Sequence, residues 1–411
     1  MQPTAGSSLP ETDLDRPRVL HPLVFLPDGE DVVVGRADID EYVVLPADGA
    51  ALVRFLADGL TPRQAADRYG EEFGESVDIT DFLATLEELG FLAAPGEAVE
   101  PPAAPAPVRW QRLGRALFGL PAWLCYAAVV GACVVEMIRV PELAPSNHHL
   151  FFTGYFTVIE LTLFFGQFPL LLIHEGFHTL AGRRLGLRSR LGISHRMMYV
   201  VLETSMDGLV AVPRRKRYLP ILAGMLADVL VIALLTLAAD ATRTPSGAFP
   251  LTGRVCLALA YGTVLRLGWQ FFLHLRTDLY VLSTTLLGCV DLHTAARGTL
   301  RNAFRRWTRR PLEDPELWHP TDRRVARWYA WLMAGGYGLT AVTFLVVVLP
   351  VGLTFVVGVL GRYNGHGSTA GLIDSTVLLV LNVAQLTAVG WLAHRDRRRA
   401  RAAGPKPVSV G

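Results

Sequence analysis

The chain has 411 residues and a formal net charge of +2; 51% of its residues are hydrophobic and only 18% are charged. This balance is unusual for a soluble enzyme and typical of a membrane protein with a soluble part attached. Acidic residues are concentrated in the first hundred positions, whereas arginine predominates beside the apolar segments. The basic residues therefore report membrane topology, and we expect no nucleic-acid partner. The four cysteines form no C-x-x-C pair, which argues against a disulfide framework and a cysteine-bound metal.

The N-terminal part is predicted to be a small soluble domain behind a disordered tail, residues 1–19. No apolar run of the kind that forms a secretory signal lies in the first twenty positions, so we expect this part to stay in the cytoplasm. The region 20–94 contains β-rich runs at Asp31–Gly35 and Glu41–Leu45, then three short helices, of which the second begins at Thr61-Pro62. This order predicts an α+β, winged-helix-like domain.

A resemblance suggests what this domain binds. The strands DVVVG and EYVVL, the helix ALVRFLADGL and the terminal LEELGFL are similar to the PqqD-like peptide-binding domain, also called the RiPP recognition element. The resemblance implies that the domain binds a leader peptide as an added strand, beside its third helix. A general docking or regulatory module is the alternative. DNA binding fits less well, because the third helix, predicted at 78–92, is acidic and phosphate would repel it.

The remainder is predicted to be a polytopic α-helical membrane domain, residues 115–394, after a Pro/Ala-rich linker at 95–114 and before a basic cytoplasmic tail at 395–411. Arginines flank alternate loops, which places both termini in the cytoplasm by the positive-inside rule. About six transmembrane helices are expected, each long enough for a hydrocarbon core of roughly 30 Å. They lie near 117–138, 151–173, 218–238, 253–275, 328–350 and 371–393.

The most informative motif is His174-Glu175-Gly176-Phe177-His178, at the end of the second apolar segment. The spacing is H-E-x-x-H, so on a helix the two imidazoles share a face and can bind one metal ion. Glu175 lies beside them and can accept a proton from water. The alternative is a helix with two histidines that face a polar cavity. Such a group near a bilayer is costly unless it is used, which favours a metal site.

A zinc site with two histidines needs a third protein ligand, and Asp278 is the best candidate. It follows the fourth predicted span, at the same cytoplasmic depth as the two histidines. His274, one helical turn earlier, and Asp228, inside the third predicted span, are alternatives. Asp228 is better suited to orient a ligand or to position the substrate. Glu203 and Asp207, in the loop between the second and third spans, are weaker candidates.

The HEGFH motif, the segment Ala223–Asp228 and the segment around Asp278 resemble the site-2 protease family of intramembrane zinc metallopeptidases, and its peptide zinc metalloprotease branch most of all. The resemblance covers roughly residues 150–300. It implies that His174, His178 and Asp278 bind Zn²⁺ and that Glu175 is the catalytic residue.

The chain departs from that family around these ligands. Asp228 stands where the family has asparagine, and Gln270, Leu273 and Leu279 replace its asparagine, proline and glycine. The ligands and the base are kept, whereas the residues that handle substrate differ. By position, Asp228, Gln270 and His274 are expected to orient ligands or to position the substrate.

The segment 191–213 is rich in β-branched residues and too interrupted by polar ones to form a span. One interpretation is a re-entrant hairpin that pairs with a strand of the substrate, because irregular backbone is tolerated at membrane depth where it lines a cavity. The other is an ordinary loop at the membrane interface.

The function predicted from these features is an intramembrane zinc-dependent endopeptidase in the cell membrane. It would hydrolyse a membrane-associated or leader-containing peptide with water activated by zinc and Glu175. A catalytically reduced scaffold, receptor or exporter component for peptide natural-product maturation is the alternative that the substitutions at 270–279 favour. A transporter with Asp228 and Glu160 as a proton relay would leave the H-E-x-x-H spacing unexplained. The oligomeric state stays open.

Overall fold

The computed structural model describes residues 14–94, 97, 108–196, 199–345 and 368–402, together with 349, 353, 356, 357, 360, 361 and 363. The predicted disordered tail as far as residue 13, most of the linker, the end of the fifth predicted span and the last nine residues lie outside this part. The chain divides into two compact units. The first comprises Met1–Arg109, Leu185–Ser189 and Met206–Arg217, and the second contains the rest.

The N-terminal unit contains a three-stranded antiparallel meander followed by three helices, which confirms the predicted order of strands and helices. The strands pair in the order β1-β2-β3, with Val33 opposite Leu26 on one side and Val44 on the other. The first strand contains a proline, which suits an edge, and the sequence analysis did not predict it. The elements are β1 (Val24–Asp28), β2 (Asp31–Arg36), β3 (Glu41–Pro46), α1 (Ala47–Ala57), α2 (Pro62–Phe73) and α3 (Ile79–Glu88).

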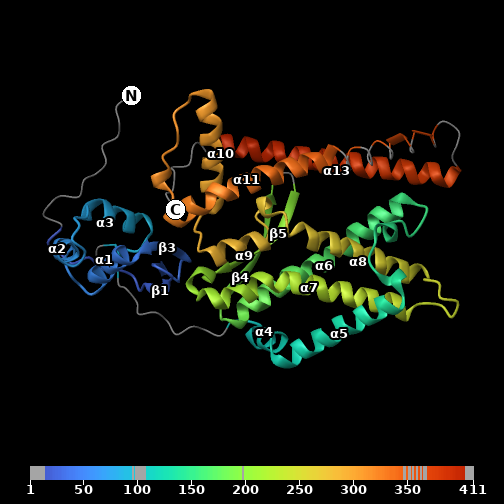
Figure 1. Ribbon diagram of the computed structural model, residues 1–411, viewed down its shortest axis with the longest axis horizontal. Coiled ribbons are helices and arrows are strands. Elements are labelled where there is room, and N and C mark those ends of the chain that lie inside the picture. The colour runs from blue at the N-terminus through green and yellow to red at the C-terminus, as the bar shows by residue number, and fades with distance from the viewer. Residues whose placement is uncertain are drawn as a thin grey trace. The chain divides into compact units, whose positions relative to one another are not determined.

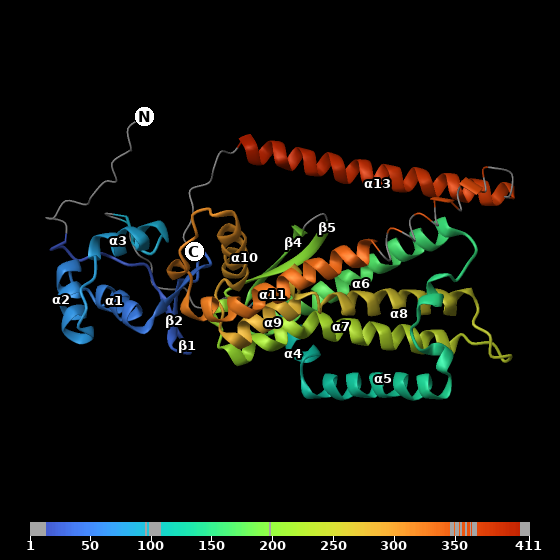
Figure 2. The same cartoon turned by 45° about the horizontal axis from the view of Figure 1, so that its top comes forward.

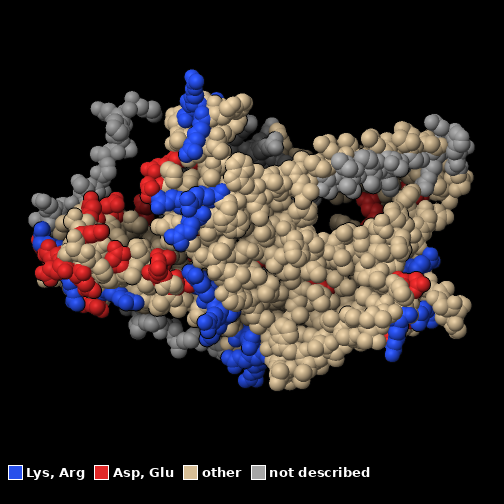
Figure 3. Space-filling view, in the orientation of Figure 1, with Lys and Arg blue, Asp and Glu red and all other residues tan. Residues whose placement is uncertain are grey.

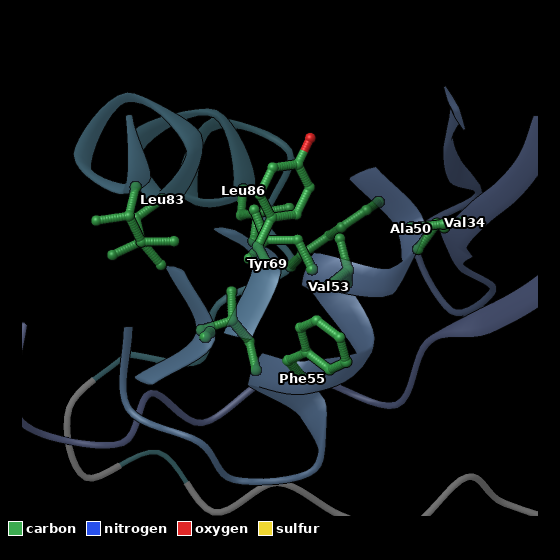
Figure 4. Close-up of a cluster of buried hydrophobic side chains, with 12 residues drawn as sticks. Val34, Ala50, Val53, Phe55, Tyr69, Leu83 and Leu86 are labelled. Carbon is green, nitrogen blue, oxygen red and sulfur yellow. The ribbon is translucent and has the colours of Figure 1, made fainter. Parts of the chain in front are cut away.

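Local sequence fixes the ends of these helices. Thr61 and Gln64 form a reciprocal capping box at the start of α2, and Gly74 ends the helix in the left-handed conformation, with φ of 73°. Asp78 caps α3 by accepting hydrogen bonds from two backbone N–H groups of its first turn. The apolar faces of all three helices meet over the sheet, as Figure 4 shows for Val53, Leu83 and their neighbours.

The second unit is built almost entirely from helices. In Figures 1 and 2, α6, α7 and α8 lie side by side along its length. Its helices are α4 (Gln111–Leu117), α5 (Leu120–Arg139), α6 (Phe156–Arg184), α7 (Arg214–Ala241), α8 (Leu251–Trp269), α9 (Asp278–Leu287), α10 (Leu292–Thr308), α11 (Pro320–Thr343) and α13 (Thr369–Ala402). The segment predicted as either a re-entrant hairpin or an interfacial loop contains a two-stranded sheet, β4 (Arg188–Arg196) and β5 (Tyr199–Asp207).

Three helices of the described chain, α5, α6 and α7, are long and apolar enough to cross a membrane. The count rises to four if α9 and α10, which meet at a 90° bend, form one broken span. Figure 3 shows a broad surface over the middle of these helices with few charged side chains, and Lys and Arg gathered toward their ends. The chain is therefore a helical protein suited to a membrane, with a small N-terminal domain.

The fourth predicted span, at 253–275, is shorter in the structure. α8 ends at Trp269, and a tight turn follows before α9 begins at Asp278. Two arginines, Arg254 and Arg266, lower the apolar character of α8, so it is not among the candidate spans. The break matters for function, because it places Asp278 in the first turn of a new helix.

Small residues let α6 approach its neighbours closely. A side chain at Gly166 would collide with Leu259 of α8, and one at Gly262 of α8 would collide with Gln167 of α6. The N-terminus of α6 is capped by Asp374 from α13, whose carboxylate accepts hydrogen bonds from two backbone N–H groups at 3.1 and 3.0 Å. These contacts fix α6, the helix that contains the H-E-x-x-H motif.

The N-terminal sheet also binds the segment that leads into α7, which belongs to the same compact unit. The carboxylate of Asp28, at the end of β1, pairs with Arg214 and lies 3.3 Å from the guanidinium of Arg217. Asp40 accepts a hydrogen bond of 2.6 Å from the backbone N–H of Gly208. The Asp28 side chain is only 11% exposed, so these ion pairs are shielded from solvent.

We expect Asp28→Asn to loosen this segment. The variant removes the charge that both guanidinium groups share, and a partly buried pair of this kind contributes on the order of 1–3 kcal/mol. Hydrogen exchange followed by mass spectrometry should show faster exchange in peptides from 206–217. Glu30→Gln, an exposed neighbour in the β1–β2 turn, is the matched control and should leave exchange unchanged. Equal exchange in the two variants would contradict a role for Asp28.

Candidate metal centre

Three predicted ligands converge in the second unit. His174 and His178 lie one turn apart on α6, and Asp278 reaches them from the first turn of α9. The two Nε2 atoms are 3.2 Å apart, and Asp278 Oδ2 lies 3.4 Å from the first and 3.3 Å from the second. Both rings are buried. The structure thus brings together two histidines and a carboxylate that could hold a metal ion.

The outer nitrogen of each ring fixes which inner atoms face the cluster. His178 Nδ1 lies 2.8 Å from the carbonyl of Pro220, and His174 Nδ1 lies 3.1 Å from a carboxylate oxygen of Asp228. Both partners are acceptors, so each Nδ1 carries the proton and donates it. In the neutral rings both Nε2 atoms then present lone pairs toward Asp278 Oδ2.

Three acceptors at this separation repel one another unless a proton or a cation lies between them. Asp278 Oδ2 is buried and has no hydrogen-bond donor among the described residues. Ligand atoms bound to zinc at roughly 2.0–2.1 Å in a tetrahedron are about 3.3 Å from one another. The three observed separations match that spacing. Two imidazoles and a carboxylate also leave one position open, as in hydrolytic zinc sites.

Gly224 of α7 leaves room for the ion. A β-carbon at this position would lie 2.2 Å from His178 Nε2 and 2.5 Å from His174 Nε2. That is about the distance at which zinc binds imidazole nitrogen, roughly 2.0–2.1 Å. Any side chain here would therefore enter the space between the ligands, and only glycine keeps it free. The donor set and the space together fit a bound metal ion.

Glu175 lies in the same turn of α6, between the two histidines in sequence, and is 7% exposed. A buried carboxylate beside a metal site is where a general base for water attack is expected. The structure therefore keeps this predicted catalytic residue within the site's own helical turn.

Gln270 positions Asp278. It follows the last residue of α8, and its side-chain oxygen accepts a hydrogen bond of 3.0 Å from the backbone N–H of Asp278. The carbonyl of Gln270 accepts a second bond, of 2.6 Å, from the hydroxyl of Thr277. These two bonds close the turn between α8 and α9 and fix where the ligand carboxylate begins.

The alternative ligands lie elsewhere. His274 is buried against α11, where its Nε2 lies 3.1 Å from Thr340 Oγ1 and its ring fills the space over Gly336. Asp228 contacts a ligand from outside and is not among the three grouped atoms. Glu203 and Asp207 fall on β5, where the described part of the chain does not include their side chains.

Arg266 and Gln167 lie next to the candidate metal centre, and neither was predicted from the sequence as a site residue. Arg266 of α8 donates to Asp228, at 2.5 Å from Nη2 and 3.2 Å from Nε, and to Gln167 of α6, at 3.2 Å. An arginine within an apolar segment was the available indication, since charged residues in such segments mark functional sites.

No family model, no curated protein and no solved structure matches this chain.

We expect Gly224→Ala to abolish metal binding, because its methyl group would occupy the space between the ligand nitrogens. Metal content after purification, measured by inductively coupled plasma mass spectrometry, should fall below about a tenth of the wild-type value. Gly176→Ala is the matched control. It lies within the same motif, and a β-carbon there meets no atom within 4 Å. A variant at Gly224 that retains full metal content would contradict this placement of the ion.

We also expect Gln270→Ala to weaken metal binding without unfolding the protein. Loss of the side-chain acceptor frees the start of α9, and the loss of such a supporting contact typically costs roughly tenfold to 100-fold in affinity. Competition with a chromophoric zinc chelator measures the change. Phe271→Ala, at the adjacent and 70% exposed residue, should bind metal as the wild type does. Unchanged affinity in Gln270→Ala would show that the turn holds Asp278 without this side chain.

Proposed function

We propose that this chain is an intramembrane zinc-dependent endopeptidase of the site-2 protease type. The observation that carries the proposal is the convergence of three lone-pair donors on a space that Gly224 keeps open. Glu175 supplies the base in the same helical turn, and α6 itself is long and apolar enough to cross a membrane. The substrate class that fits is a peptide or membrane protein that reaches the site from the bilayer or its surface.

His174, His178 and Asp278 would hold the ion. When bound, zinc supplies a Lewis acid that polarises the scissile carbonyl and makes water more acidic. Glu175 then removes the proton from the attacking water and returns it to the leaving amine. Asp228 and the carbonyl of Pro220 keep the two imidazoles in the tautomer whose Nε2 atoms face the ion.

The proposed topology extends the three or four candidate spans to six, with both termini in the cytoplasm. It is supported by the arginine clusters that flank alternate loops and by the helices α11 and α13 at the fifth and sixth predicted segments. On this topology the ligand end of α6 lies toward the cytoplasm, because Arg183 and Arg184 follow it. Water and a cytoplasmic peptide could then reach the site from that side.

The N-terminal domain is proposed to bind the substrate or its leader. Its sheet has two edge strands, β1 and β3, and an extended peptide can add to either by backbone hydrogen bonds. The helix α3, with its acidic residues, lies in the same small domain. A basic peptide segment would therefore suit it better than nucleic acid.

A transporter with a proton relay has less support. Glu160 is hydrogen-bonded to Asn382 of α13, at 3.1 Å, whereas Asp228 is paired with Arg266 and His174. Glu160 and His174 are fourteen residues apart on α6, which is roughly 21 Å along the helix axis. The two carboxylates thus belong to separate groups of contacts. A scaffold that has lost catalysis would bind the metal but cleave no peptide, so a cleavage assay distinguishes it from the enzyme.

We expect Glu175→Gln to keep the metal and to lose hydrolysis. The amide preserves the size of the side chain but accepts no proton, and loss of a general base lowers turnover by about 10²- to 10⁴-fold. Membrane fractions from a strain that lacks the protein are incubated with purified wild type or variant, and new peptide N-termini are identified by mass spectrometry. Zinc content is measured on both samples.

Cleavage products that form only with the wild type support the endopeptidase. A wild type that binds one zinc ion and generates no new N-termini supports the scaffold. Products that form at the same rate with Glu175→Gln would contradict the mechanism.

A further inference from the structure

An ion pair between α7 and α8 lies beside the proposed metal centre, on the side of His174 that faces away from the other ligands. Asp228 is completely buried, with 0% exposure, and both of its carboxylate oxygens accept hydrogen bonds. Oδ2 accepts from His174 Nδ1 at 3.1 Å and from Arg266 Nε at 3.3 Å, and Oδ1 accepts from Arg266 Nη2 at 2.5 Å. One carboxylate therefore connects a ligand of α6 to an arginine of α8.

The arginine is itself held in place. Its Nη1 donates to the side-chain oxygen of Gln167 at 3.2 Å, and the amide nitrogen of Gln167 donates to the carbonyl of Leu259 at 2.8 Å. Gln167 lies seven residues, or two turns, before His174 on the same side of α6, and it packs over Gly262 of α8. The row of contacts thus runs from α8 through α6 and α7 back to the ligand.

The charges explain why this row is needed. A carboxylate that orients a metal-bound imidazole strengthens the ligand, but an isolated buried carboxylate is strongly unfavourable. The guanidinium of Arg266 neutralises Asp228 by donating to both carboxylate oxygens, and one of these oxygens also accepts from His174. Together Asp228 and Arg266 add no net charge beside the ion.

We propose that Arg266 is a positioning residue of the metal centre, which acts on His174 through Asp228 and sets the charge balance around the ion. The inference rests on the proposed function, because it requires that His174 binds a metal. If so, the effects of the two side chains on zinc affinity are coupled. Removing both charges should lower the affinity less than removing only the charge of the carboxylate.

The experiment compares four proteins purified in detergent as full chains. They are the wild type, Asp228→Asn, Arg266→Met and the double variant Asp228→Asn/Arg266→Met. Zinc affinity is measured by competition with a chromophoric chelator, and cobalt substitution reports a tetrahedral site through its visible absorption. Thermal unfolding of the metal-free protein is followed in parallel. Arg254→Met, at the other and exposed arginine of α8, is the control for loss of an arginine.

Asparagine can still accept the hydrogen bond from His174, so Asp228→Asn removes the charge and keeps the contact. The positive charge of Arg266 is then no longer neutralised, and it repels the zinc ion bound to His174. Zinc affinity should therefore fall by roughly tenfold to 100-fold. The double variant restores neutrality, so its zinc affinity should return to within about threefold of the wild-type value. Its cobalt absorption spectrum should match that of the wild type. Arg266→Met should unfold at a lower temperature, because it leaves Asp228 buried and unpaired.

The possible results distinguish the role of Arg266 from the proposed function of the metal centre. A double variant that binds zinc as weakly as Asp228→Asn would overturn the role of Arg266 and leave the metal site intact. Wild-type affinity and unfolding temperature in Arg266→Met would do the same. If the wild type binds no zinc and shows no tetrahedral cobalt spectrum, the proposed function and this inference both fail. If Arg266→Met does not fold, the comparison of Asp228→Asn with the double variant still decides.

Discussion

The convergence of three acceptors, with no donor to Asp278 Oδ2 among the residues that the structure describes, is the constraint on which the rest of the site depends. His174 and His178 present Nε2 lone pairs because their Nδ1 atoms are already donating, and Asp278 adds a carboxylate oxygen at 3.3–3.4 Å. A protein interior tolerates such an arrangement only where a proton or a cation offsets the repulsion and the desolvation. The surrounding contacts are therefore those that aim three acceptors at one point. The same point is where Gly224 has no side chain.

One helix face organises most of these contacts. Pro220, Gly224 and Asp228 follow one another at intervals of four residues on α7, so they lie on the same side of the helix. The carbonyl of Pro220 accepts from His178, Gly224 leaves space between the two Nε2 atoms, and Asp228 accepts from His174. The two histidines lie on α6, whereas α7 fixes their tautomers and the space between them. A small rotation of α7 would disturb all three functions together.

The sequence predicted which residues converge at the candidate site because their spacing has a direct physical meaning. Four residues on a helix bring two imidazoles to one face, and a carboxylate after the next apolar segment can complete the set. It also predicted two of the three strands, the cap at Thr61 and the helices of the N-terminal domain, where local patterns are strong. The first strand was missed, because Val24–Asp28 is short and contains a proline.

Contacts between distant helices left weaker traces in the sequence. The end of α8 at Trp269 depends on how Gln270 and Thr277 bond across the turn, which composition does not show. The part played by Gly224 appears only when two helices place it against the ligand nitrogens. Arg266 was recognisable as a charge in an apolar segment, but its partner Asp228 lies 38 residues away in sequence. Charge pairs between helices need the fold before they can be assigned.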